Sequence, residues 1–219
     1  MYQPHAQALG DELWSQLKEL APLRTRPARS ILLREGDSGT HVILLAWGSA
    51  VITRTARNGE RMLLAVRGAG ELLGELAVLD SQPRTASVLA AEKCGVHVIP
   101  AVDFLKFVES HDLLSLLLQH AIARVREGDA VRVELATSPV PVRLASALER
   151  LCKAATMSAS FVTVRLTQTE LSQLIGASRN AVGAALKPWR ERGWIETTSG
   201  GGLSIRNISA IQSHAGMTL

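Results

Sequence analysis

The segment from Ser30 to Pro100 constrains the fold most, because it divides into short apolar runs separated by glycines. The runs predicted to be strands are Ser30–Leu33, His41–Ala46, Ala50–Thr55, Arg61–Val66, Ser87–Ala90 and Gly95–Ile99. Asn58-Gly59 is typical of a tight hairpin turn. Since no helix is predicted between these runs before Glu75, we expect an antiparallel barrel or roll rather than a parallel α/β sheet.

Helical patterns flank this segment. Asp11–Leu20 predicts a short amphipathic helix, and a second helix begins at Ala101–Phe107. His111 to about Ala136 predicts a helix of about seven turns with a seam at alternating spacings of four and three. The seam consists of Leu114, Leu118, Ala121, Val125, Gly128, Arg132 and Leu135. Because a small roll cannot cover so long a helix, we favour a dimer helix over one that packs only on the roll.

A second domain is predicted after Pro139 and Pro141, which end the long helix. Val142–Ala154 is an amphipathic helix. Thr167-Gln168-Thr169-Glu170 is a capping box that opens another helix, which continues to Gly176.

A further helix is expected to begin at Ser178, with Val182 and Leu186 facing inward, and helix, glycine turn and helix form a helix-turn-helix. Pro188 is expected to kink this helix or end it near Lys187. Trp194–Thr197 and Gly202–Ile205 predict two wing strands around the turn Thr198-Ser199-Gly200-Gly201.

The stretch from Gly74 to Ala86 places a carboxylate, an arginine and a hydroxyl around a short apolar turn. Glu75 can accept a hydrogen bond from a ribose hydroxyl, and Arg84 can bind a phosphate through two N–H groups. Thr85 adds a neutral donor, and the backbone N–H groups of the turn suit an anion. This set predicts a site for a cyclic ribose phosphate, and the alternative is an ordinary pair of surface charges.

The Gly-Glu pair, the apolar turn and the Arg-Thr-Ala that follows resemble the phosphate-binding cassette of cyclic-nucleotide-binding domains. Thr167 to Leu186 resembles the helix-turn-helix of the Crp/Fnr regulators. Both resemblances occur in that family's order and together cover nearly the whole chain. They imply an α+β fold with a jelly-roll-like β-roll over residues 1–110, a dimerisation helix over 111–137 and a winged helix-turn-helix over 138–219.

The resemblance also implies which residues bind. The expected ligand-binding residues are Gly74, Glu75, Leu76, Ala77, Arg84, Thr85, Ala86 and Asp129. The expected DNA-binding residues are Thr167, Gln168, Ser178, Arg179, Asn180, Gly183 and Lys187. We therefore expect a homodimeric transcription regulator that binds operator DNA, contacts RNA polymerase and responds to a cyclic nucleotide. Cyclic AMP is favoured, and the alternative is a regulator that needs no ligand or takes another effector such as a cyclic dinucleotide.

Two departures limit what the resemblance implies. Family members that bind cyclic AMP have a glutamate and a further arginine in the reading helix, where this chain has Asn180 and Ala184, so we expect a different operator. They also carry a Thr-Ser pair on the long helix that contacts the purine, and here the stretch is Glu127-Gly128-Asp129-Ala130. Asp129 can accept from an adenine amino group or stay solvated, which leaves the identity of the base open.

Composition argues against several other classes. Cys94 and Cys152 are too few for an iron–sulfur cluster, a zinc site or a disulfide framework, so no metal or cofactor is expected. The six histidines are scattered and no H-E-x-x-H, P-loop or G-x-S-x-G motif occurs, so we expect no enzyme. No apolar run approaches the roughly 20 residues that cross a bilayer, which favours the cytoplasm and no membrane partner. The net charge of +4 does not by itself show that the winged helix binds DNA, so a winged helix that binds protein stays an alternative.

Overall fold

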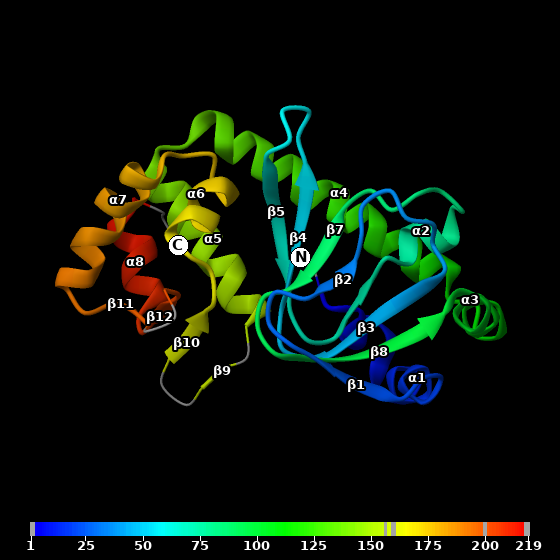
Figure 1. Cartoon of the computed structure of the whole chain (residues 1–219). Coiled ribbons are helices and arrows are strands. Elements are labelled where there is room, and N and C mark those ends of the chain that lie inside the picture. The colour runs from blue at the N-terminus through cyan, green and yellow to red at the C-terminus, as the bar shows by residue number, and fades with distance from the viewer. Residues whose placement is uncertain (1–2, 156, 159–160, 199–200, 217–219) are drawn as a thin grey trace. The chain divides into compact units, whose positions relative to one another are not determined.

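The computed structural model describes residues 3–155, 157–158, 161–198 and 201–216 of the chain (Figure 1). The chain divides into two compact units. The first unit comprises Met1–Arg61 with Val66–Asp129, and the second comprises Met62–Ala65 with Ala130–Leu219. Antiparallel sheets and helices build the first unit, while short helices and a small sheet build the second, so the predicted α+β class is confirmed.

Two four-stranded antiparallel sheets form the roll, and of their residues only Met62–Ala65 belong to the second unit. Their strands are β1 (Leu23–Arg26), β2 (Ile31–Leu33), β3 (His41–Trp47), β4 (Ala50–Thr55), β5 (Arg61–Arg67), β6 (Glu71–Leu73), β7 (Ser87–Ala90) and β8 (Cys94–Pro100). One sheet has the order β1-β8-β3-β6 and the other β2-β7-β4-β5. Ile43 of β3 lies opposite Val98 on one side and Leu73 on the other, which holds β6 at a sheet edge. The sequence pattern does not predict β1 or β6.

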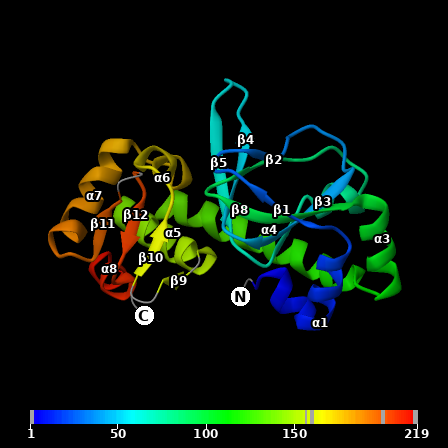
Figure 2. The same ribbon diagram turned by 60° about the horizontal axis from the view of Figure 1, so that its bottom comes forward.

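Four helices begin in the first unit: α1 (His5–Glu19), α2 (Glu75–Leu79), α3 (Ala101–Ser110) and α4 (Leu114–Thr137). α1 begins at His5 rather than Asp11, because it continues through a kink at Gly10, where φ is 79°. α4 begins at Leu114 rather than His111, since Asp112 has a φ of 50° and separates it from α3. Figure 2 shows α1 and α3 beside the β1-β8-β3-β6 sheet.

Strand β3 is buried on both faces, which explains why its sequence is almost continuously apolar. Ile43 and Leu45 pack in the core between the two sheets. Val42 and Leu44 point the other way and pack in the core that includes α1 and α3. Two hydrophobic clusters therefore meet across one strand, next to the edge strand that leads into α2.

The predicted seam of α4 is exposed along its first half. Leu114, Leu118 and Val125 are 59%, 58% and 64% exposed, while Leu117 and His120 of the same helix are buried. The alternative that this stripe only packs on the roll is therefore wrong for these three residues. Within the described part of the chain, no helix combines the length and the apolar character needed to cross a bilayer.

The second unit has the layout of a winged helix. Its helices are α5 (Val140–Ala154), α6 (Gln168–Leu174), α7 (Arg179–Glu191) and α8 (Ile208–His214), and its sheet has the order β11-β12-β10-β9. The strands are β9 (Met157–Ser158), β10 (Phe161–Val164), β11 (Ile195–Thr197) and β12 (Leu203–Ile205). The predicted wing strands are confirmed as β11 and β12, whereas β9, β10 and α8 are not predicted. The turn residues Ser199 and Gly200 lie outside the described residues.

Three predicted helix boundaries in this unit are wrong. α5 already begins at Val140, because Pro141 lies in its first turn, where no backbone N–H is needed. α6 ends at Leu174, before Gly176. α7 continues through Pro188 to Glu191, although proline inside a helix costs about 3 kcal/mol. The next residue, Trp189, is fully buried and donates from Nε1 to His214 Nδ1 at 3.1 Å, so its packing offsets that cost.

Candidate functional site

Gly74 links the edge strand β6 to α2 and lies at the centre of the predicted ligand site. Its φ of 85° is in the left-handed region, which suits glycine. A Cβ atom at this position would lie 2.1 Å from Arg84 Nη1 and 2.7 Å from Leu33 Cδ1. The close approach of the guanidinium to the backbone therefore requires glycine here.

Arg84 is buried, with 4% of its surface exposed. Its Nη1 donates to the Gly74 carbonyl at 3.2 Å and its Nη2 to the His41 carbonyl at 2.6 Å. Burial lowers the pKa of this guanidinium, while Asp37 and Glu75 raise it, and arginine stays charged in proteins. A buried cation whose hydrogen-bond partners here are neutral carbonyls is suited to receive an anion.

A cavity of about 370 Å³ opens against Arg84. Its lining consists of residues 31–34, Asp37, Ser38, Thr40, His41 and Arg84. Burial, followed by the nearby Arg84 and Arg26, lowers the pKa of His41, so this imidazole adds no cation at neutral pH. Glu75 does not line this cavity, and its carboxylate belongs to a neighbouring polar network. Among the described residues, no three His, Cys, Asp or Glu side chains gather as a metal site requires.

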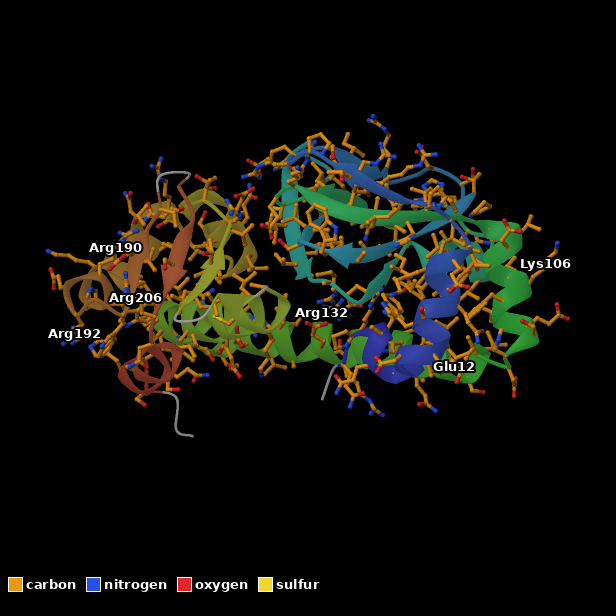
Figure 3. The ribbon with its side chains drawn as sticks, turned by 90° about the horizontal axis from the view of Figure 1, so that it is seen from below. Glu12, Lys106, Arg132, Arg190, Arg192 and Arg206 are labelled. Atoms are coloured by element: carbon orange, nitrogen blue, oxygen red, sulfur yellow. The ribbon has the colours of Figure 1, made fainter. Side chains whose placement is uncertain are left out.

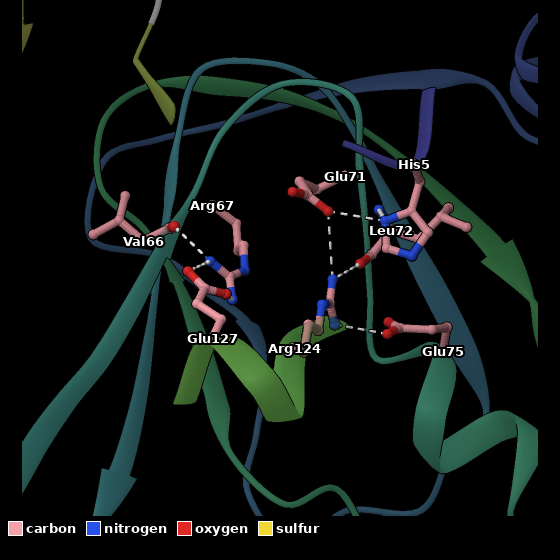
Figure 4. Close-up of polar contacts among 8 residues, drawn as sticks. All are labelled: His5, Val66, Arg67, Glu71, Leu72, Glu75, Arg124 and Glu127. Carbon is pink, nitrogen blue, oxygen red and sulfur yellow. Dashed lines mark hydrogen bonds and ion pairs between the residues drawn. The ribbon is translucent and has the colours of Figure 1, made fainter. Parts of the chain in front are cut away.

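Glu75 is 2% exposed and lies in the first turn of α2. Its Oε1 accepts from Arg124 Nη1 at 2.7 Å, as Figure 4 shows. Its Oε2 is also buried and has no hydrogen-bond partner among the described residues. An unsatisfied buried carboxylate oxygen costs free energy, so Oε2 has the capacity to accept a hydrogen bond from a donor of another molecule.

Arg124 of α4 is a site residue that the sequence reasoning missed. Besides Glu75, its Nη2 donates to the Leu72 carbonyl at 3.1 Å and lies 3.4 Å from Glu71 Oε2. Leu117, His120 and Arg124 follow spacings of three and four, so they share one helix face, which lies beside the exposed seam. The sequence carries no local signal for this role, because only tertiary packing brings Arg124 to Glu71 and Glu75.

The remaining predicted ligand residues lie around this centre. Ala77 of α2 is buried and Leu76 is 38% exposed. Thr85 is exposed and Ala86 is half-buried, directly after Arg84. Asp129 is exposed on α4, one residue beyond Gly128. The structure thus brings Gly74, Glu75 and Arg84 together, and leaves the side chains of Thr85 and Asp129 at the surface.

The start of α6 is the capping box that the sequence predicts. Thr167 Oγ1 accepts from the Glu170 N–H at 3.2 Å, and Glu170 Oε2 accepts from the Thr167 N–H at 2.8 Å. A turn with Gly176 at a φ of 58° leads to Ser178, whose Oγ caps α7 by accepting from the Ala181 N–H at 3.2 Å. Both predicted helix starts are confirmed.

The first turn of α7 presents polar side chains to solvent. Ser178, Arg179 and Asn180 are exposed, while Val182 and Leu186, further along the helix, are fully buried. Of the other predicted DNA-binding residues, Lys187 is exposed, and Thr167, Gln168 and Gly183 are half-buried. A helix with an anchored apolar face and exposed Arg and Asn at its N-terminal end has the form that enters a major groove.

Additional arginines surround the end of α7 and the wing, as Figure 3 shows for Arg190, Arg192 and Arg206. Arg206 pairs with Glu196 at 3.0 Å, across β11 and the end of β12. Arg192 lies over the Trp194 ring at 5.4 Å. These local contacts give the two side chains a structural role in the wing.

Comparison with known proteins identifies both regions. Residues 23–111 match the family described as the cyclic nucleotide-binding domain, and residues 142–213 match the Crp-like helix-turn-helix domain. The CRP-like cAMP-activated global transcriptional regulator of Mycobacterium tuberculosis is 30% identical over 182 residues, which cover 81% of each chain. The chain belongs to the Crp/Fnr family. It is a Crp-like DNA-binding transcription regulator with a cyclic nucleotide-binding domain, and the curated relatives are regulators rather than enzymes.

Solved Crp/Fnr structures share the fold. FixK2 from Bradyrhizobium japonicum has a TM-score of 0.74 at 15% identity and covers 88% of this chain and 96% of its own. The c-di-GMP responsive global regulator CLP from Xanthomonas campestris has a TM-score of 0.69 at 20% identity and covers 90% of this chain and 100% of its own. At these identities the similarity supports the Crp/Fnr fold alone.

Proposed function

We propose that this Crp-like regulator acts as a homodimer that binds cyclic AMP in its first unit and operator DNA through α7. One observation carries the ligand proposal: two buried side chains of opposite charge near Gly74 each have capacity left to bind another molecule. Glu75 has an oxygen without a hydrogen-bond partner among the described residues, and the guanidinium of Arg84 contacts neutral carbonyls.

The two groups match the chemistry of a cyclic ribose phosphate. Glu75 Oε2 accepts from the ribose 2′-hydroxyl, and Arg84 supplies charge-assisted N–H bonds to the ring phosphate. Thr85 adds its exposed hydroxyl, and the backbone of Leu76, Ala77 and Ala86 completes the loop around the phosphate. The name of the Mycobacterium tuberculosis relative, a cAMP-activated regulator, supports cyclic AMP as the effector.

The α4 residues expected to contact the purine offer few hydrogen-bonding groups. Gly128 has no side chain, and Asp129 can accept from an adenine amino group but offers no donor when ionised. This observation favours a second effector class as the alternative to cyclic AMP. That class is another cyclic nucleotide or a cyclic dinucleotide, which would use Arg84 for phosphate in the same way.

The exposed stripe on α4 supports the homodimer. Leu114, Leu118 and Val125 continue with Ile122 and Val133, which are 43% and 63% exposed. In aqueous solution, large apolar side chains that repeat along a helix are buried by packing against a matching helix. A second copy of α4 provides that match, and a symmetric dimer would present two α7 helices to successive major grooves.

The ligand is proposed to act by population shift, because it can change DNA binding only by favouring the dimer form that fits the operator. Arg179 and Asn180 would read base edges, as Arg pairs with guanine and Asn with adenine. The bound regulator would contact RNA polymerase in the cytoplasm, where its DNA target lies.

Calorimetric titration with cyclic AMP, cyclic GMP and cyclic di-GMP tests the ligand proposal. Cyclic AMP should bind with the highest affinity, and it should then tighten binding to a selected operator in a gel shift at fixed salt. No heat with any of the three compounds would refute the cyclic-nucleotide site. Heat only with cyclic di-GMP would replace cyclic AMP by the second effector class.

A further inference from the structure

A buried polar network lies behind Glu75 and includes residues from the N-terminal helix. His5 of α1 is 0% exposed, and Glu71 of β6 and His120 of α4 are 3% and 8% exposed. Figure 4 shows the series from His5 through Glu71 and Arg124 to Glu75. The series joins four elements, α1, β6, α4 and α2, and it ends at the proposed acceptor of the ribose hydroxyl.

His5 holds Glu71 through a short hydrogen bond. Its Nδ1 lies 2.8 Å from Glu71 Oε2 and 3.3 Å from the Leu72 nitrogen. One ring nitrogen cannot donate to the carboxylate and accept from Leu72 at the same time. Because the contact with the carboxylate is the shorter and the charge-assisted one, we assign Nδ1 as a donor to Glu71.

His120 stacks on the His5 ring, with centroids 3.9 Å apart and planes 20° apart. Burial, followed by the neighbouring His5, lowers the pKa of His120 to about 4, so this ring is neutral near pH 7. It therefore supports the His5 ring by packing without adding a cation beside Arg124. Beyond Arg124, Arg67 of β5 binds Glu127 of α4 through contacts of 2.7 and 3.3 Å, which occupies that carboxylate.

Arg124 is shared between two carboxylates, and the sharing is unequal. It lies 2.7 Å from Glu75 Oε1 but 3.4 Å from Glu71 Oε2, which is the same oxygen that His5 binds. An arginine fork can bind one carboxylate through two parallel bonds, so a Glu71 released from His5 would compete for Arg124. The bond from His5 to Glu71 weakens that competition.

We propose that His5 is a positioning residue for the effector: by binding Glu71 it leaves Arg124 to orient Glu75 toward the ligand. This inference rests on the proposed function. It makes the N-terminal helix a part of the ligand site, although α1 acts on the ligand only indirectly, through Glu71 and Arg124. A purely structural role for His5 would stabilise α1 without affecting the geometry of Glu75.

The substitution His5→Leu tests this proposal in the full-length protein. Cyclic AMP affinity, measured by calorimetry, should fall about tenfold, the effect of losing one well-placed hydrogen bond to a charged group. Adding Glu71→Gln should restore the affinity to within about threefold of the wild type, because a neutral amide no longer draws Arg124 away from Glu75. A double variant that stays as weak as His5→Leu would overturn the proposal.

His97→Leu is the matched control. His97 is likewise a buried histidine, whose Nδ1 contacts the Ala21 carbonyl at 2.7 Å and ties β8 to the segment before β1. Its loss should destabilise the roll, as thermal unfolding will record, and leave cyclic AMP affinity unchanged. Equal losses of affinity in His97→Leu and His5→Leu would show that both act only through stability, and would refute the positioning role.

A readout without ligand separates this inference from the proposed function. The Arg124 Nε–H resonance in a ¹⁵N spectrum should move in His5→Leu and return in the double variant. If the wild type binds none of the nucleotides but this pattern appears, the proposed effector is wrong and the positioning role stands. A resonance that stays in place in His5→Leu refutes the positioning role whatever the ligand.

Discussion

The ligand site and the DNA-reading element are assembled from very different stretches of chain. His5, Glu71, Arg84 and Arg124 come from four separate segments, and each depends on a fold that brings its neighbours into place. The helix-turn-helix lies within residues 167–191, and its capping bonds join residues three apart. Substitutions far away in sequence should therefore affect the ligand site. The helix-turn-helix should respond mainly to substitutions within its own residues.

Arg84→Ala should produce the largest effect and test the first half of this comparison. The variant removes the buried cation and its charge-assisted bonds to the phosphate, so cyclic AMP affinity should fall at least about 100-fold. Calorimetry measures the loss. Arg34→Ala is the matched control, because Arg34 lines the same cavity but is exposed. A retained affinity in Arg84→Ala would show that the ligand does not use this guanidinium.

Acid should destabilise the first unit through His120. Its pKa is about 4 in the folded protein and about 6.5 when unfolded, so the unfolded chain binds more protons between those values. Stability therefore rises with pH across this window and is lost as the pH falls from about 6.5 toward 4, by up to about 3 kcal/mol. Denaturant unfolding at each pH measures the loss.

His120→Gln should flatten that part of the curve, since a glutamine does not titrate. His111→Gln, at an exposed histidine, is the control and should leave the curve as in the wild type. Other carboxylates also take up protons in acid, so the difference between the variant and wild-type curves is the quantity to compare. Parallel curves for His120→Gln and the wild type would contradict the assignment.

Arg179→Ala tests the independence of the second region. Loss of a base contact should weaken operator binding by about 1–3 kcal/mol while cyclic AMP affinity stays the same. Gel shifts and calorimetry measure the two quantities separately. Lys153→Ala is a suitable control, since that lysine pairs with Glu149 on α5 and not on α7. An equal loss of operator binding in both variants would indicate general electrostatics rather than base reading.

Thr167→Ala should have the smallest effect and remain local. Removal of the cap at α6 should lower the stability of the second unit by about 1 kcal/mol, without changing ligand affinity. Thermal unfolding of Thr167→Ala measures this loss of stability. Thr169→Ala is the control, because Thr169 lies in the same turn but is not the capping residue. If the two variants unfold alike, the capping box does not stabilise the unit.

The same contrast explains how far the sequence predicts this molecule. Thr167 and Glu170 are three residues apart and encode their own bonds, so the start of α6 could be predicted without knowledge of the fold. Gly74, Glu75 and Arg84 could be predicted as one group because they lie within a short stretch.

Arg124 and His5 could not be assigned to the site in advance, since only tertiary packing brings them to Glu71 and Glu75. Leu23–Arg26 was not predicted as a strand because its side chains are all exposed, and pairing with β8 rather than burial makes it one. For Pro188, the packing of Trp189 outweighs the local preference that predicts a helix end.

Strand β3 contributes side chains to both hydrophobic clusters, and this determines how the first unit unfolds. Because Val42 and Leu44 serve one hydrophobic cluster while Ile43 and Leu45 serve the other, neither cluster can come apart without exposing this strand. Its amides should exchange with deuterium only when the whole unit unfolds. The helix that carries His5 and the two sheets would then unfold together, as a single cooperative block.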